Sequence, residues 1–203
     1  MHSESRSPRP IRAGSLALAS LLIVCAGANA QMKNPSFSAD QVKVTAGKTS
    51  TTKVYSSDKA VRVEKEEKGR KSITIMHLDQ KSVWVLNPDQ KTYMDMGGLG
   101  AASMDLANSV GDSKLEREAL GSETIGAYHC DKYRVKTTFD GKVYTMIEWD
   151  AKELGGFAVK QADEKGGWSK EYQNVKLGPQ DPSLFELPAD YKKLDLGAMF
   201  GKR

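Results

Sequence analysis

Apolar residues from Phe37 onward recur at every second position far more often than at every third or fourth. Clear pairs between polar neighbours are Val42 and Val44, Val61 and Val63, Ile73 and Ile75, and Val83 and Val85. Because adjacent side chains of a β-strand point to opposite faces, this period is typical of strands with one buried face. The pattern predicts a mainly β protein with an antiparallel sheet.

Turn signals separate these runs. They are Ala46-Gly47-Lys48, Ser57-Asp58, Lys68-Gly69, Asp79-Gln80, Asn87-Pro88-Asp89 and Asp140-Gly141. The Asp-Gly pair is the strongest, because a type I′ turn needs a positive φ at both central residues. It predicts a hairpin that joins Tyr128–Phe139 to Lys142–Trp149. Further strands are expected over Leu115–Leu120, Phe157–Gln161 and Trp168–Val175, which gives about ten strands in all.

Two segments have helical features. Between Gly97 and Val110, apolar residues fall three apart, which predicts a short helix. A second short helix is expected to start at Asp150, whose side chain would cap Ala151–Leu154 before Gly155-Gly156 ends it. A sheet of this size must curl to bury its faces. We therefore expect an open, curled antiparallel half-barrel with one or two short helices as a lid over an apolar space.

The first thirty residues are organised like a secretory signal peptide. Three arginines precede the uncharged run Ala13–Ala26, and Ala28-Asn29-Ala30 supplies a cleavage site. The run is too short to span a bilayer, which takes about 20 residues. We expect a protein of the Gram-negative periplasm, cleaved after Ala30, with one domain over 31–203 and no membrane span in the mature chain. The alternative is a lipoprotein acylated at Cys25.

Charge and ligand counts exclude several classes of function. Removing the leader lowers the formal net charge of +4 by two, and lysines are mixed with acidic residues, so nucleic-acid binding has no basic stripe to support it. Cys130 is then the only thiol, and we expect it in the core. The neighbouring His129 would point to the opposite face, so the two do not form a nucleophile and base. His77 and His129 are too few for a three-His zinc site.

No cofactor, metal or catalytic residue is expected. Met94 and Met96 share a strand face, Met76 on a neighbouring strand is a further candidate, and thioethers suit cuprous copper. Methionine also fills irregular apolar cavities without a metal, and cavity lining is the preferred interpretation.

Three blocks carry a resemblance to a known family. The segment Ser72–Met96, centred on Ser82-Val83-Trp84-Val85-Leu86-Asn87-Pro88, resembles the periplasmic lipoprotein carrier LolA and its relatives. Gly121–Gly126 leading into Cys130–Val135 is similar to a second shared block, and Leu184–Tyr191 resembles the C-terminal strand and exit. The chain looks like an exported, uncharacterised branch of this LolA-like superfamily, catalogued as a domain of unknown function.

The resemblance implies an unclosed barrel that shelters acyl chains under a helical lid. In the carrier an arginine inside the barrel holds the lid closed, and Arg62 is the residue that could take this place as a lid latch. Glu64 lies on the same strand face, so an ordinary Arg62–Glu64 ion pair is the alternative.

The candidate ligand wall follows from aromatic and apolar residues on the expected strands. It comprises Ile73, Ile75, Trp84, Leu86, Tyr133, Val135, Ile147 and Trp149. The alternative is that these residues pack directly against the helix and leave no cavity.

The sequence thus predicts a non-enzymatic periplasmic protein that binds an apolar ligand, a lipid or an acylated peptide, in the half-barrel. The alternative is a cell-envelope interaction module with a filled core, whose open sheet edge pairs with a partner protein.

Overall fold

The computed structural model describes residues 35–97, 115–139 and 142–194 of the chain. The expected signal peptide, Cys25 and the Asp140-Gly141 turn lie outside the described residues. So does the expected helix, apart from its first residue, Gly97.

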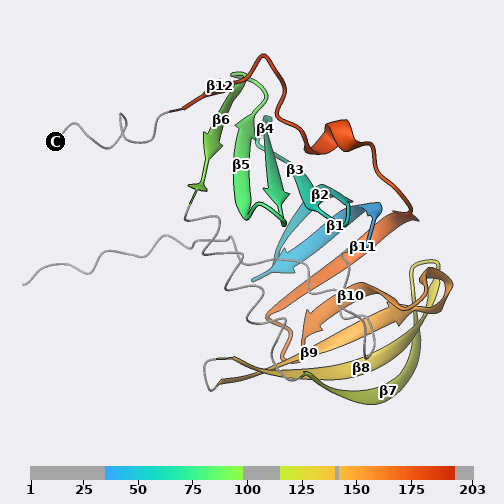
Figure 1. The fold of residues 1–203 in the computed structure, drawn as a ribbon. Coiled ribbons are helices and arrows are strands. Elements are labelled where there is room, and N and C mark those ends of the chain that lie inside the picture. The colour runs from blue at the N-terminus through green and yellow to red at the C-terminus, as the bar shows by residue number, and fades with distance from the viewer. Residues whose placement is uncertain (1–34, 98–114, 140–141, 195–203) are drawn as a thin grey trace, which may run out of the picture.

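Twelve strands form one sheet, and two short 3₁₀ turns, η1 and η2, accompany it (Figure 1). The elements are β1 (Phe37–Thr45), β2 (Lys48–Ser56), β3 (Ala60–Glu67), β4 (Arg70–His77), β5 (Ser82–Asn87), β6 (Thr92–Asp95), β7 (Leu115–Ile125), β8 (Tyr128–Phe139), β9 (Lys142–Ala151), η1 (Lys152–Leu154), β10 (Phe157–Asp163), β11 (Trp168–Leu177), η2 (Pro182–Phe185) and β12 (Lys192–Lys193). The part of the chain that the structure describes therefore contains strands and 3₁₀ turns.

The strand order is β12-β6-β5-β4-β3-β2-β1-β11-β10-β9-β8-β7. Strands β1–β6 and β7–β11 each form an up-and-down meander, and antiparallel pairing of β1 with β11 joins the two meanders. Among the strands of the described residues, the short β12 alone pairs in parallel, with β6. Strands β7 and β12 end the sheet, so the barrel is open, and the predicted mainly β half-barrel is confirmed.

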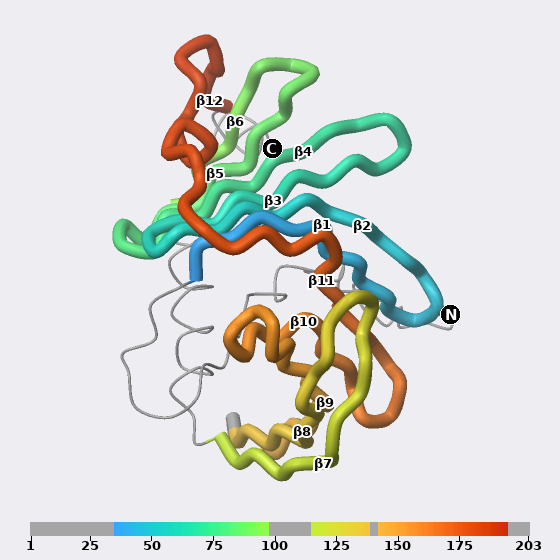
Figure 2. Tube along the Cα trace, turned by 90° about the vertical axis from the view of Figure 1, so that its right-hand side faces the viewer, coloured from blue at the N-terminus to red at the C-terminus, as the bar shows by residue number. Residues whose placement is uncertain are grey.

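The sheet curls so that its two limbs face one another, with β1–β6 on one side and β7–β9 on the other (Figure 2). Three aromatic rings meet on the side toward which it bends. The Phe37 and Phe157 rings are 4.9 Å apart, and each lies within 5.7 Å of Tyr172. Strands two apart in a flat sheet are about 9.6 Å from one another, so this contact between β1 and β10 marks the concave side. We call the face that carries Phe37 and Tyr172 the inner face.

Register extends the inner face across the neighbouring strands, because aligned residues of paired strands share a face. Ser56, opposite Phe37, aligns with Val61, and Val61 aligns with Met76. Val54 and Val63 form the next aligned pair. All four apolar residues belong to the larger apolar cluster or pack against it, so the inner face of β2–β4 is an apolar strip.

The outer face of β3–β6 is covered by the C-terminal segment Pro182–Lys193. Phe185 is buried with Ile75 and Leu86, and Leu184, Leu187 and Tyr191 pack against the same cluster. Asp181 caps η2 by accepting a hydrogen bond from the Ser183 amide at 2.9 Å, with Pro182 at the first position. This second cluster gives the sheet a packed layer on its outer side.

The helix expected from Asp150 is present only as the 3₁₀ turn η1, which begins at Lys152, and the cap assigned to Asp150 is wrong. Strand β9 continues to Ala151, which pairs with Cys130 and Phe157, and only the three-residue turn η1 follows. The Asp150 carboxylate contacts the Arg117 guanidinium instead of capping a helix. Gly155 ends the turn in the left-handed conformation at φ 65°, as the glycine pair predicted.

Candidate binding site on the inner face

The structure divides the expected ligand wall among three places. Four of its residues form one patch on the outer face, because Ile75 aligns with Trp84 and Ile73 aligns with Leu86. Their side chains belong to the cluster that the C-terminal segment covers. A ligand would reach this patch only where that segment does not already pack.

Trp149 and Ile147 lie on the face of β9 opposite to Glu148. The Trp149 ring lies between Lys132 Nζ at 5.0 Å and Lys160 Nζ at 5.2 Å, and its Nε1 donates a hydrogen bond to Glu123. Only 7% of this tryptophan is exposed. The indole is therefore held by a cation–π sandwich and a hydrogen bond of its own chain.

Tyr133 and Val135 are the expected wall residues on the inner face. Tyr133 aligns with Glu148, which aligns in turn with Gln161, and Gln161 aligns with Lys170, two residues before Tyr172. Val135 is fully buried, and the Arg117 guanidinium carbon lies 4.2 Å from the centre of the Tyr133 ring. The role of the eight residues as a ligand wall stays a prediction.

Arg62, the expected lid latch, makes two contacts on the outer face. Its Nε donates to Glu64 at 2.7 Å, and its Nη1 donates to the carbonyl oxygen of Leu184 at 2.9 Å. The Arg62–Glu64 pair that the sequence offered as an alternative is therefore present. The arginine also fastens η2 of the C-terminal segment to the sheet, while its role as a lid latch stays a prediction.

A group of charged and polar side chains lies on the inner face of β7–β11, and the sequence analysis did not find it. We call it the inner-face charged cluster; its members are Arg117, Glu148, Asp150, Gln161 and Lys170. Arg117 Nη2 contacts Glu148 Oε1 at 3.0 Å and Asp150 Oδ2 at 2.5 Å. Gln161 Nε2 donates to Glu148 Oε2 at 2.6 Å. Four strands, β7, β9, β10 and β11, thus bring together groups that are far apart in the sequence.

Burial sets the electrostatics of this cluster. Glu148 is fully buried, Asp150 is 8% exposed and Lys170 is 7% exposed. Desolvation raises the pKa of Glu148 to about 7, with a further rise from the Asp150 charge, against the lowering effects of Gln161, Arg117 and Lys170. Desolvation also raises the pKa of Asp150, although the bond to Arg117 opposes it. Buried, perturbed ionisable groups of this kind mark candidate functional sites.

One sequence signal could have identified the cluster. In the run Ile147–Ala151, apolar and acidic residues alternate. Both faces of this part of β9 are buried, since all four residues of Glu148–Ala151 are buried. Two carboxylates two residues apart in a central strand therefore indicated a buried polar site.

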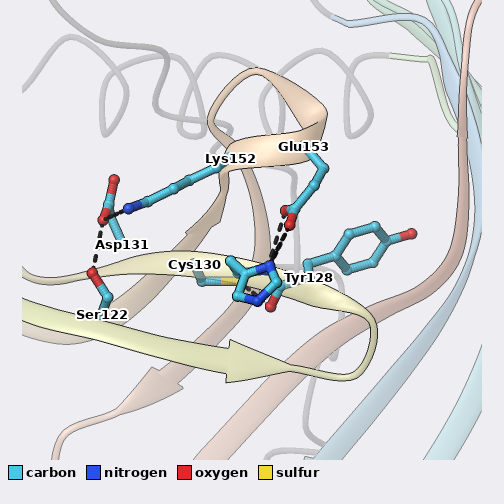
Figure 3. A network of polar contacts seen from close by, with 7 residues as sticks. Ser122, Tyr128, Cys130, Asp131, Lys152 and Glu153 are labelled. Carbon is cyan, nitrogen blue, oxygen red and sulfur yellow. Dashed lines mark hydrogen bonds and ion pairs between the residues drawn. The ribbon is translucent and has the colours of Figure 1, made fainter.

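The side chains of His129 and Cys130 have different surroundings, as expected for adjacent residues of one strand. Cys130 is buried and burial raises the pKa of its thiol, whereas the exposed His129 contacts Glu153 through Nδ1 at 2.7 Å. Figure 3 shows Glu153 and Lys152 of η1 reaching over β8, with Lys152 directed to Asp131. Because the Cys130 thiol is buried and the His129 ring contacts Glu153, the two side chains do not form a nucleophile and its base.

Among residues 35–97, 115–139 and 142–194, no group of three or more His, Cys, Asp or Glu side chains is placed to hold a metal ion. The same residues form no helix with the length and hydropathy that a membrane crossing requires.

Comparison with one solved structure, at a TM-score above 0.5, supports the fold. An uncharacterised conserved protein from Thermus thermophilus is similar with a TM-score of 0.53 and 14% identity, over 79% of this chain and 90% of that chain. The lipoprotein LppX from Mycobacterium tuberculosis has a TM-score of 0.46 and 11% identity, over 74% of this chain and 90% of its own. A putative outer membrane lipoprotein-sorting protein domain from Vibrio parahaemolyticus has a TM-score of 0.29 and 10% identity, over 74% of this chain and 88% of its own.

No curated protein matches the sequence. Residues 41–155, more than half of the chain, match the model of one protein family. This stretch begins in β1 and ends just after η1, so it includes the apolar strip and the Arg117, Glu148 and Asp150 part of the charged cluster. The match confirms the expected membership of an uncharacterised family: the chain belongs to the family described as Domain of unknown function (DUF4412).

Proposed function

We propose that this protein is an exported, non-enzymatic binding protein that holds an apolar ligand, a lipid or an acylated peptide, against the inner face of its half-barrel. The observation that carries the proposal is an open, curled sheet whose concave side bears an apolar strip. Val63 and Met76 in this strip are only partly buried, so they retain surface that a ligand could cover.

The two faces of the sheet differ in what already covers them. On the outer face, Phe185 and its neighbours pack on Ile75 and Leu86. The inner face also carries Tyr133 and Val135, two expected wall residues outside the cluster that the C-terminal segment covers. Burial of apolar surface contributes about 25 cal/mol per Å² to the binding free energy. This favours ligands with a long apolar chain and does not by itself select a particular head group. We therefore place the ligand on the inner face.

The proposal is tested by native mass spectrometry and organic extraction of mature protein, purified from a periplasm without detergent. We expect a phospholipid or other acyl species bound in a stoichiometric amount. The same spectrum gives the mass of the mature chain, which separates cleavage after Ala30 from acylation at Cys25. An empty, folded protein that also takes up no fluorescent fatty acid would contradict the proposal.

A second candidate is an interaction module of the cell envelope, and one observation favours it. Strand β7 ends the sheet, and most of its eleven residues are exposed, among them Leu120. An exposed edge of this length is a template for a strand from a partner. A photo-crosslinker at Leu120 that captures one envelope protein in cells, together with an empty inner face, would favour this function.

A further inference from the structure

The inner-face charged cluster is continuous with the apolar strip. Lys170 lies two residues before Tyr172 on β11, and its Nζ is 5.5 Å from the centre of that ring. The Tyr172 ring in turn contacts Phe37 on β1, which aligns with Ser56 beside Val54. One face therefore offers an apolar surface at one limb and buried charges at the other.

Two carboxylate oxygens of the cluster lack hydrogen-bond donors. Asp150 Oδ1 accepts no hydrogen bond from the residues that the structure describes, and neither does Glu148 Oε1, although Arg117 lies beside it as an ion pair. The Glu148 side chain is fully buried, and the Asp150 side chain is 11% exposed. A buried acceptor without a donor is unfavourable, so a donor supplied by a ligand would be favoured here.

The charges of the cluster balance when all four ionisable groups are charged. Arg117 and Lys170 are opposed by Glu148 and Asp150, and Tyr133 lies beneath the guanidinium. A cationic or anionic head would add an uncompensated charge to a buried site. An uncharged head adds none, and the Arg117 side chain, 24% exposed, is within reach of its acceptor atoms.

We propose that the inner-face charged cluster binds the uncharged, hydrogen-bonding head of an amphiphile, a hydroxyl or amide group, while its acyl chain lies on the apolar strip. The head donates to Glu148 Oε1 and Asp150 Oδ1 and accepts from Arg117. This inference rests on the proposed function and adds the class of head group to it.

The test compares three ligands with the same acyl chain length: glycerol monododecanoate, dodecanoate and dodecylammonium. Each displaces a fluorescent fatty acid from the protein above the Glu148 pKa of about 7. We expect the glycerol ester to bind roughly tenfold more tightly than either ion, the ratio that one hydrogen bond to a charged group provides. Just below that pKa, Glu148 takes up a proton and the cluster becomes positive, so dodecanoate alone should gain affinity.

Matched variants assign the effect to the cluster. Glu148→Gln removes the charge, and we expect the advantage of the glycerol ester over dodecanoate to disappear while the chain still binds. Glu171→Gln is the control, because Glu171 lies on the other face of β11, where it pairs with Lys160 at 3.7 Å. If Glu148→Gln does not fold, the affinities of the three ligands for the unaltered protein and their pH dependence test the head-group assignment.

The outcomes separate this inference from the proposed function. Equal binding of all three ligands, or an unchanged ratio in Glu148→Gln, would overturn the head-group assignment and leave apolar binding intact. Failure of all three to bind would overturn both.

Discussion

Glu148 makes the stability of this protein depend on pH in a direction opposite to that of most carboxyls. Burial raises its pKa to about 7 in the folded protein, from the ordinary value of 4.5 for a glutamate. The folded state therefore binds this proton more tightly than the unfolded chain does. The stability that Glu148 contributes is complete below pH 4.5 and is lost as the pH rises through 7, with a full change on the order of 3 kcal/mol.

Glu148→Gln should remove this dependence, because the amide has no proton to lose. We expect the difference in free energy of unfolding between variant and unaltered protein to shift in favour of the variant as the pH rises from 4.5 to above 7. Urea unfolding at a series of pH values measures it, with Glu171→Gln as the control. A difference that stays constant over this range would show that Glu148 is ionised in the folded protein throughout.

At the residue scale, alternation predicted which side chains share a face but not which face turns inward. Ile147 and Trp149 were expected toward the ligand, whereas the structure places Glu148, which lies between them, on the inner face. The alternation has a period of two whichever of the two faces points inward. The inward side depends on how the whole sheet bends, and that follows from contacts such as Phe37 with Phe157, which lie 120 positions apart.

The C-terminal segment is an element whose place on the sheet no local pattern predicted. It has one 3₁₀ turn and a two-residue strand, and its position depends on long-range contacts: Arg62 with the Leu184 carbonyl, Lys91 with Asp190, and Lys193 with Asp95. By contrast, β1, β3, β4 and β5 were found from alternation, and each turn signal up to Asn87-Pro88-Asp89 falls between two strands. Alternation and turn residues predict hairpins from the local sequence. The place of a segment without an apolar period depends on the residues it packs against.

Phe185→Ala tests the segment as a structural element. Phe185 is 6% exposed and packs with Ile75 and Leu86, so we expect a loss of about 3 kcal/mol in the free energy of unfolding, from lost burial and the cavity left behind. Leu177→Ala is the control, because Leu177 is 48% exposed and should change stability by no more than about 0.5 kcal/mol. Equal losses in urea unfolding would mean that the segment is not held by this contact.

At the scale of the whole molecule, the open sheet has two faces that could each bind an apolar chain. The wall expected from the sequence lies partly on the outer face, whereas we propose that the ligand binds the inner face. Val63 and Ile73 form a matched pair for this question. Both are partly buried and β-branched, and they lie on the neighbouring strands β3 and β4. Val63 belongs to the inner face, whereas Ile73 belongs to the outer patch under the C-terminal segment.

Val63→Asp should weaken binding of glycerol monododecanoate by tenfold or more, because a carboxylate on the apolar strip must be desolvated by the chain. Ile73→Asp should lower stability but leave the affinity within about twofold, because its side chain contacts Leu86 and the covering segment rather than the ligand. Val63→Thr and Ile73→Thr repeat the comparison with a smaller change, should either charged variant unfold. A loss of affinity in the Ile73 variants alone would move the ligand to the outer patch, and would require the C-terminal segment to leave Ile75 and Leu86 when the ligand binds.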